Sequence, residues 1–154
     1  MTDALYRFAY RVAYQLARTY WRIRRPCTHG ALVIVWKHGR VLLVRNSYVS
    51  YYSPPGGYVH RGESARDTAS RELKEEVGVA VDSSDLRLAL EVTHEWEFRH
   101  DHVTLFDIEV SEAQVPVPDA REVVAADFFT PDEALLLNLF PPVRQYLESH
   151  VAAS

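Results

Sequence analysis

The segment GYVHRGESARDTASRELKEEVGV, from Gly57 to Val79, carries the clearest structural pattern of the chain. Within it, Glu72, Glu75 and Glu76 stand at positions i, i+3 and i+4. On a helix this spacing brings the three carboxylates to one face, within about 6 Å of each other. Like charges at that distance destabilise a helix, whereas a hard divalent cation turns their repulsion into coordination by oxygen ligands. The segment therefore predicts a helix that binds Mg²⁺ or Mn²⁺.

The order of residues in this segment resembles the Nudix box, a signature of glycine, glutamate, arginine and aliphatic residues at set distances. All of its specified positions are filled, by Gly57, Glu63, Arg71, Glu72, Leu73, Glu75, Glu76, Gly78 and Val79. The resemblance extends over about residues 28–150. It implies the Nudix fold, an α/β/α sandwich around a mixed β-sheet. It also implies a hydrolase that uses water and a divalent metal to cut the phosphoanhydride bond of a nucleoside diphosphate linked to another group.

The resemblance implies roles for individual residues. Glu72, Glu75 and Glu76 are expected to bind the metal, together with the backbone carbonyl of Gly56. For Glu72 three roles stay open, since it could ligate the metal, orient the attacking water or act as the base. Arg71 is expected to hold an acid of the segment in place, and contact with substrate phosphate is its alternative role.

Other positions are expected to support or complete the site. Glu63 either caps the helix or supports the acid cluster, and we expect the supporting role. Gly57 lets the loop fold over the metal and Gly78 ends the helix, because glycine accepts positive φ and close backbone approach. Many Nudix enzymes supply a further acid from a late loop, for which Glu122 is the candidate and Asp119 the next. A solvated loop acid is the alternative interpretation of Glu122.

Nucleoside recognition has to come from outside the segment. The aromatic candidates for stacking on a base are Tyr48, Tyr51, Tyr52 and Trp96. Aromatic rings stack on any nucleobase, but in a small sheet they also serve as core. Both interpretations stay open for each of the four.

Composition bounds the class of protein. The chain has 154 residues, 47% of them hydrophobic and 25% charged, which predicts a single domain. A net charge of −4 argues against a wide nucleic-acid interface and favours a small nucleotide substrate without a stable nucleic-acid partner. A nucleotide-binding regulatory module without turnover and an RNA-end pyrophosphohydrolase are the alternative functions. The single Cys27 is interpreted as a buried small hydrophobe.

The N-terminal residues 1–26 are predicted to form an amphipathic helix ahead of the Nudix domain at residues 27–150. One helical stripe is basic and the opposite stripe is apolar; the basic one holds Arg7, Arg11, Gln15, Arg18, Arg22 and Arg25. Three roles are open: packing on the domain or on a second copy in a homodimer, docking on an anionic membrane, and contact with substrate phosphates. We expect a cytoplasmic protein, because this region lacks the features of a secretory signal.

Hydrophobic periodicity predicts the remaining elements. A hairpin of strands at residues 28–37 and 41–45 is followed by a loop at 46–55 and a helix at 65–76, whose buried stripe is Ala69, Leu73 and Val77. Strands are predicted at 86–98 and 102–110 around a turn at 99–101, and at 124–129. Helices are predicted at 131–137 and 141–150, each with proline in its first turn. This order predicts a mixed α/β domain.

Overall fold

The computed structural model describes residues 2–111, 114, 116–118 and 120–153, which form a six-stranded mixed sheet with helices on both faces. The mixed α/β class is therefore confirmed. The strands are β1 (Cys27–Lys37), β2 (Arg40–Asn46), β3 (Gly56–Tyr58), β4 (Arg87–Trp96), β5 (Arg99–Glu109) and β6 (Val123–Phe129). The helices are α1 (Thr2–Arg24), α2 (Ala65–Val77), α3 (Pro131–Leu135) and α4 (Pro141–Ala152), with a 3₁₀ turn at Ser83–Asp85.

The sheet order is β4-β5-β1-β2-β6, and β1 is its centre. β1 pairs in parallel with β5 along almost its whole length, whereas it pairs with β2 only next to their hairpin, at Trp36 and Lys37. Farther from the hairpin, β3 takes the place beside β1, opposite Gly30 to Leu32. β1 and β2 therefore diverge toward one end of the sheet, and this end holds the candidate site.

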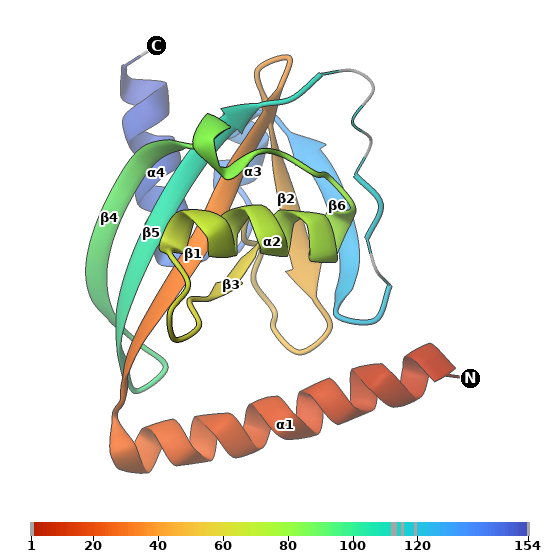
Figure 1. Cartoon of the computed structure of the whole chain (residues 1–154), viewed down its shortest axis with the longest axis vertical. Coiled ribbons are helices and arrows are strands. Elements are labelled where there is room, and N and C mark those ends of the chain that lie inside the picture. Colours follow the sequence, from red (N-terminus) through yellow and green to blue (C-terminus); the bar gives the residue numbers. More distant parts are fainter. Residues whose placement is uncertain (1, 112–113, 115, 119, 154) are drawn as a thin grey trace.

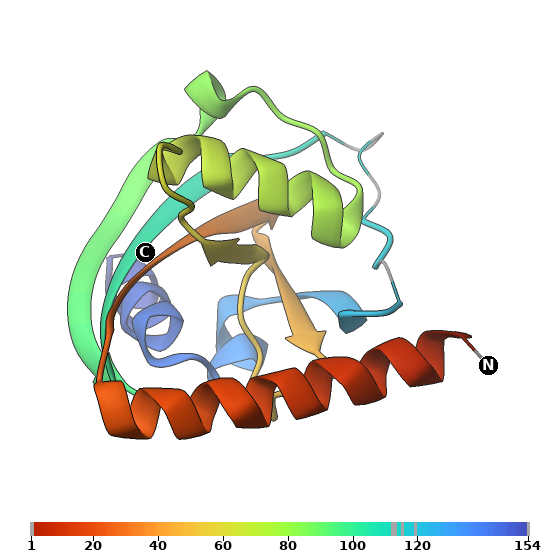
Figure 2. The same cartoon turned by 60° about the horizontal axis from the view of Figure 1, so that its bottom comes forward.

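Each face of the sheet has its own apolar core. Because side chains of a strand alternate between faces, Val33 and Val35 pack toward α2, whereas Ile34 and Trp36 pack toward α3 and α4. Figures 1 and 2 show α2 on one side of the sheet and α4 on the other. The predicted sandwich is confirmed by this arrangement.

Three local predictions are wrong. The turn between β4 and β5 lies at Glu97 and Phe98, both with positive φ, so residues 99–101 belong to β5. The segment Gly56–Tyr58, expected as loop, is a strand because it pairs with β1. Cys27 is exposed, since it begins β1 ahead of the part of the strand that enters the core.

Helix α1 crosses the end of the sheet where β1 and β2 diverge, as both views show (Figures 1 and 2). Its Arg7 donates to the carbonyl of Ala120, and its Arg11 to the carbonyl of Ser47. One side of α1 therefore packs on the domain. No helix in the described part of the chain has both the length and the apolar content needed to cross a bilayer.

Candidate active site

Helix α2 positions the acidic residues of the Nudix box. It begins after Ser64, whose hydroxyl accepts from the backbone N–H of Asp67, and it ends at Gly78, which has φ of 73°. Ala69, Leu73 and Val77 are fully buried against the sheet, as the periodicity predicts. Because these three residues fix the rotation of the helix, the acid row is turned toward β3.

Glu76 lies deepest among the acids, with 6% of its surface exposed. Its Oε2 accepts a hydrogen bond from the backbone N–H of Gly56 at 3.0 Å. Burial first, and then the nearby charges of Glu122 and Glu72, together raise the pKa of Glu76 to about 8, against the hydrogen bond from Gly56, which lowers it. The site thus contains a carboxylate whose charge is poorly compensated.

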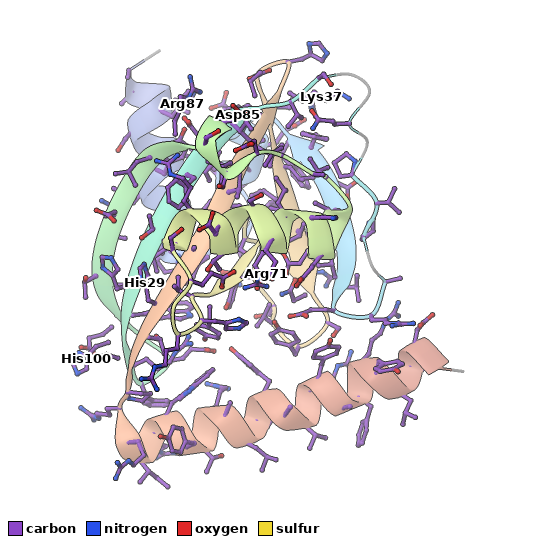
Figure 3. All side chains as sticks on the ribbon, viewed as in Figure 1. His29, Lys37, Arg71, Asp85, Arg87 and His100 are labelled. Atoms are coloured by element: carbon purple, nitrogen blue, oxygen red, sulfur yellow. The ribbon has the colours of Figure 1, made fainter. Side chains whose placement is uncertain are left out.

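Arg71 joins three carboxylates of the box. Its Nε and Nη2 donate to Glu63 at 2.9 and 3.2 Å, and its Nη1 donates to Glu72 at 2.7 Å and to Glu75 at 3.1 Å. Figure 3 shows the labelled Arg71 side chain on the side of α2 toward β3. Hydrogen bonds from Arg71 are the main cause that lowers the pKa of Glu63 to about 2. Glu63 therefore contacts Arg71, whereas the N-cap of α2 is Ser64.

Gly57 makes room for Glu72. A Cβ atom at Gly57 would lie less than 3.0 Å from the carboxylate carbon of Glu72 and from its Oε1. The neighbouring Gly56 is just as tightly enclosed, by the backbone of Ala31 and Leu32. Close backbone approach thus explains both glycines.

Glu122 lies near the acid cluster although it is 46 positions beyond Glu76 in the chain. Its Oε1 accepts from the hydroxyl of Tyr48 at 2.6 Å, and its backbone carbonyl accepts from the N–H of Ser47 at 2.8 Å. Its charge acts on Glu76, whose pKa it raises. Asp119, the second candidate for a late-loop acid, lies outside the described residues.

The donor set suits a hard divalent cation. Glu63, Glu72 and Glu75 surround the positive charge of Arg71, and Glu76 lies close enough to Glu72 and Glu122 for their charges to raise its pKa. Carboxylate oxygens are the ligands that Mg²⁺ and Mn²⁺ prefer. Among the residues that the structure describes, no group of three acidic, histidine or cysteine side chains is arranged to hold a metal ion. The ion pairs with Arg71 account for this, because they direct Glu72 and Glu75 toward the guanidinium.

A cavity of about 320 Å³ adjoins the acid cluster at Gly56 and Gly57. Three of the four predicted stacking residues line it, namely Tyr48, Tyr51 and Trp96. Tyr52 does not line it, since its ring packs edge-on against Phe129, with the ring centres 5.9 Å apart. The prediction for Tyr52 therefore has no support in the geometry.

Several lining residues were not anticipated from the sequence: Tyr10, Ala13, Tyr14, Ala17 and Trp21 of α1, and Asn46, Tyr58, Arg99, Asp101 and Phe140 elsewhere. The sequence pattern places Arg99 and Asp101 in a turn, whereas they belong to β5 and are only 3% and 4% exposed. A usable signal was present, because Arg99, Asp101, Val103 and Leu105 continue one strand face with a period of two. For the α1 residues the sequence offers no comparable signal.

Comparison with solved structures shows the fold. The chain resembles the MutT NUDIX hydrolase from Burkholderia pseudomallei with a TM-score of 0.70 and 23% identity, covering 79% of this chain and 96% of that one. It resembles an Ap4A hydrolase of C. elegans with a TM-score of 0.70 and 18% identity, covering 81% of this chain and 96% of that one.

Sequence comparison identifies a related protein and a family model that matches this chain. The NAD-capped RNA hydrolase NudC of Pseudomonas syringae pv. syringae is 31% identical over 124 residues, which are 79% of this chain and 43% of the relative. The chain thus spans less than half the length of that curated relative. The model of the NUDIX domain matches residues 28–149.

Proposed function

The chain belongs to the NUDIX domain family, and we propose that it is a metal-dependent hydrolase that cleaves the pyrophosphate bond of a small nucleoside-diphosphate derivative. The observation that carries the proposal is the juxtaposition of the acid cluster and the cavity. Gly56 and Gly57 line the cavity, and the carboxylates of Glu76 and Glu72 lie directly behind them. A substrate with its nucleoside in the cavity would thus extend its phosphates toward the acids.

Glu72, Glu75 and Glu76, with the backbone carbonyl of Gly56, would hold Mg²⁺ or Mn²⁺. When bound, the metal would neutralise the phosphate oxygens and lower the pKa of a water molecule to be used as the nucleophile. Glu75 suits a position at the solvent side, since 59% of its side chain is exposed, whereas Glu76 is buried behind Gly56.

Arg71 and Tyr48 would orient the acids. Arg71 contacts three of them through its planar, multidentate guanidinium, so we assign it a positioning role ahead of phosphate contact. Tyr48 restrains Glu122 by its hydrogen bond. Glu122 would accept the proton of the attacking water or complete the acid cluster, because its charge already acts on Glu76.

A second candidate substrate is the 5′ end of a capped RNA. The curated relative of Pseudomonas syringae pv. syringae is an NAD-capped RNA hydrolase, and it matches most of this chain. The same acid cluster would serve either substrate, because both contain a phosphoanhydride. The choice between the two therefore depends on the cavity and its surroundings.

The test is metal-dependent turnover of a substrate panel by the wild type and Glu76→Gln. The panel contains nucleoside triphosphates, ADP-ribose, nucleotide sugars, dinucleoside polyphosphates and capped RNA, each with Mg²⁺ or Mn²⁺. We expect turnover that falls at least about 100-fold in Glu76→Gln, because the substitution keeps the volume but removes the charge. The matched control is Glu148→Gln on the exposed side of α4, which should keep wild-type turnover. Tight binding without turnover would identify a regulatory module instead.

Homodimer formation and peripheral membrane contact through α1 stay predictions. The side of α1 away from the domain exposes an apolar stripe formed by Leu5, Phe8, Val12, Leu16 and Ile23. Either association would use this stripe. Light scattering reports homodimer formation, and flotation with anionic vesicles reports membrane contact. Leu16→Glu should weaken whichever association uses the stripe.

A further inference from the structure

We propose that α1 forms one wall of the substrate cavity, called the roof below, and limits the size of the substrate. The site then accepts the nucleoside of a free nucleotide and excludes a nucleic-acid chain. This inference rests on the proposed hydrolase function and deepens it. The helix spans Thr2–Arg24, and the family model begins at residue 28. The roof is therefore a feature of this chain outside the matched domain.

The roof is attached to the domain at three places. Arg7 donates twice to the carbonyl of Ala120, at 3.0 and 2.7 Å. Arg11 donates to the carbonyl of Ser47 at 3.1 Å, just before the cavity residue Tyr48. At the β4–β5 turn, Glu97 accepts from the hydroxyl of Tyr14 and pairs with Arg18 at 3.6 Å. Attachment to three separate segments holds α1 in place as one wall of the cavity.

The face of α1 toward the cavity alternates large and small side chains. Tyr14 and Trp21 contribute rings, and Ala13 and Ala17 leave open space between them. The cavity volume of about 320 Å³ is at the low end of the range of about 300–1,000 Å³ found for small-molecule sites. A cavity of this size suits a single small planar group such as one nucleobase.

The lining suits a nucleobase. Tyr51 and Trp96 contribute aromatic rings to the cavity wall, where both also pack on Phe140. Arg99 and Asp101 supply a donor and an acceptor at the same cavity, and the guanidinium of Arg99 lies 3.9 Å from the ring centre of Trp21. Apolar faces with a few polar groups are the usual composition of a small-molecule site.

The charge distribution does not suit an RNA chain. Residues 26–154 contain 11 basic and 20 acidic residues, a net charge of −9, and the compensating arginines are concentrated in α1. Arg7, Arg11 and Arg18 of α1 already contact the domain. They are therefore engaged in fixing the roof and not arranged as a track for phosphates, which RNA binding would require.

The first test compares hydrolysis of the same phosphoanhydride bond in a free nucleotide and at the 5′ end of an RNA. The pairs are NAD with an NAD-capped RNA of about ten nucleotides, a length that exceeds the cavity, and ATP with the corresponding 5′-triphosphate RNA. We expect kcat/KM on each RNA to be lower than on its free partner by at least about 100-fold. Equal values within about threefold, or preference for RNA, would overturn the inference.

The second test narrows the cavity from the roof. Ala17→Phe projects a ring into the open space, and Leu16→Phe places the same ring on the outer side, where Leu16 is 68% exposed. We expect Ala17→Phe to raise KM for the cleaved free nucleotide about tenfold or more with little change in kcat, whereas Leu16→Phe leaves both unchanged. Ala13→Phe, one turn away on the same face, gives a second variant if Ala17→Phe fails to fold. Unchanged KM in a folded cavity variant would overturn the inference.

A binding measurement separates this inference from the proposed function. Calorimetric titration with ATP and Mg²⁺ reports the cavity even if no substrate is hydrolysed. If the protein binds ATP without hydrolysing any substrate and Ala17→Phe weakens this binding, the proposed hydrolase function is rejected and the role of α1 is retained. If the protein hydrolyses a substrate and no cavity variant changes the kinetics, the hydrolase function is retained and the role of α1 is rejected. If there is neither binding nor turnover, both are rejected.

Discussion

The carboxylate of Glu76 accepts a hydrogen bond from the backbone N–H of Gly56, 20 residues earlier in the chain. Glu76 ends the acid row of α2, and Gly56 begins β3 and lines the cavity. The bond therefore connects the acid cluster to the cavity wall directly. A change in the charge around Glu76 should therefore change the stability of both the acid cluster and the cavity wall.

Divalent metal should stabilise the fold. Because the buried Glu76 lies beside the charges of Glu72 and Glu122, a cation that binds there only in the folded protein raises its stability, by about 2.7 kcal/mol at 100 times the dissociation constant. We expect the melting temperature to rise from EDTA to excess Mg²⁺ in the wild type and in Glu148→Gln, and to change little in Glu76→Gln. An equal rise in Glu76→Gln would place the bound metal elsewhere.

Replacing Arg71 by lysine should disorder the acids. A lysine ammonium is a compact charge that cannot reproduce the fork joining Glu63, Glu72 and Glu75. We expect kcat to fall at least about tenfold in Arg71→Lys, measured at saturating metal and substrate. Arg66→Lys, on the same helix but in contact with the carbonyl of Leu86 and the ring of Phe106, is the matched control and should retain kcat.

Adding a methyl group at Gly57 should displace Glu72. The new Cβ would overlap the carboxylate of Glu72, so Gly57→Ala should lower both activity and the free energy of unfolding. Shortening the partner makes room, and the loss of stability on Gly57→Ala should be smaller in a Glu72→Asp background. Chemical denaturation of the four proteins of this cycle measures the coupling. Additive losses would show that the two residues do not collide.

The predictable part of the structure depends on local patterns. Helix α2 could be placed because Ala69, Leu73 and Val77 repeat with the helical period and Gly78 follows. Strand β3 could not, because its two glycines have little strand propensity and it is stabilised by pairing with Gly30 to Leu32. The turn at Glu97 and Phe98 was missed because neither residue is typical of positive φ.

The position of α1 over the cavity could not be predicted for a different reason. The amphipathic pattern identified the helix and its basic stripe, but not the surface that the stripe contacts. Arg7 meets Ala120 across 113 positions of sequence, through a backbone carbonyl that any residue could provide. Such a contact leaves no trace in residue types, whereas the acids that we propose as metal ligands are recognisable because that chemistry demands glutamate at fixed spacing.

Low pH should lower the free energy of unfolding through protonation of His94. Burial lowers the pKa of His94, whose ring packs on Trp96 and Phe140. Near pH 6.5 the unfolded chain then binds more protons than the folded protein, so stability is complete above this pH and is lost as the pH falls below it. We expect the free energy of unfolding to drop from about pH 7 to about pH 5, and to drop less in His94→Gln. His38→Asn, at the exposed β1–β2 turn, should keep the wild-type dependence.

The hydrogen bond from Tyr48 should matter only through Glu122. Burial, and next the neighbouring charge of Glu122, raise the pKa of Tyr48, so its hydroxyl stays protonated and donates to the carboxylate at neutral pH. Tyr48→Phe removes this donor while keeping the ring in the cavity, and we expect kcat to fall about threefold to tenfold with KM nearly unchanged. Tyr52→Phe, outside the cavity, should leave both constants at wild-type values.

The double variant decides whether Tyr48 acts through Glu122. Glu122→Gln should reduce kcat more than Tyr48→Phe does, because it removes the charge that the hydroxyl only orients. In the Glu122→Gln background Tyr48→Phe should cost little further activity, since residues that act as a unit are not additive. Independent, multiplicative losses would show that Tyr48 contacts the substrate by itself and that Glu122 is a solvated loop acid. The pH dependence of kcat/KM distinguishes the two cases as well, because only an orienting role shifts the acidic limb of the profile in Tyr48→Phe.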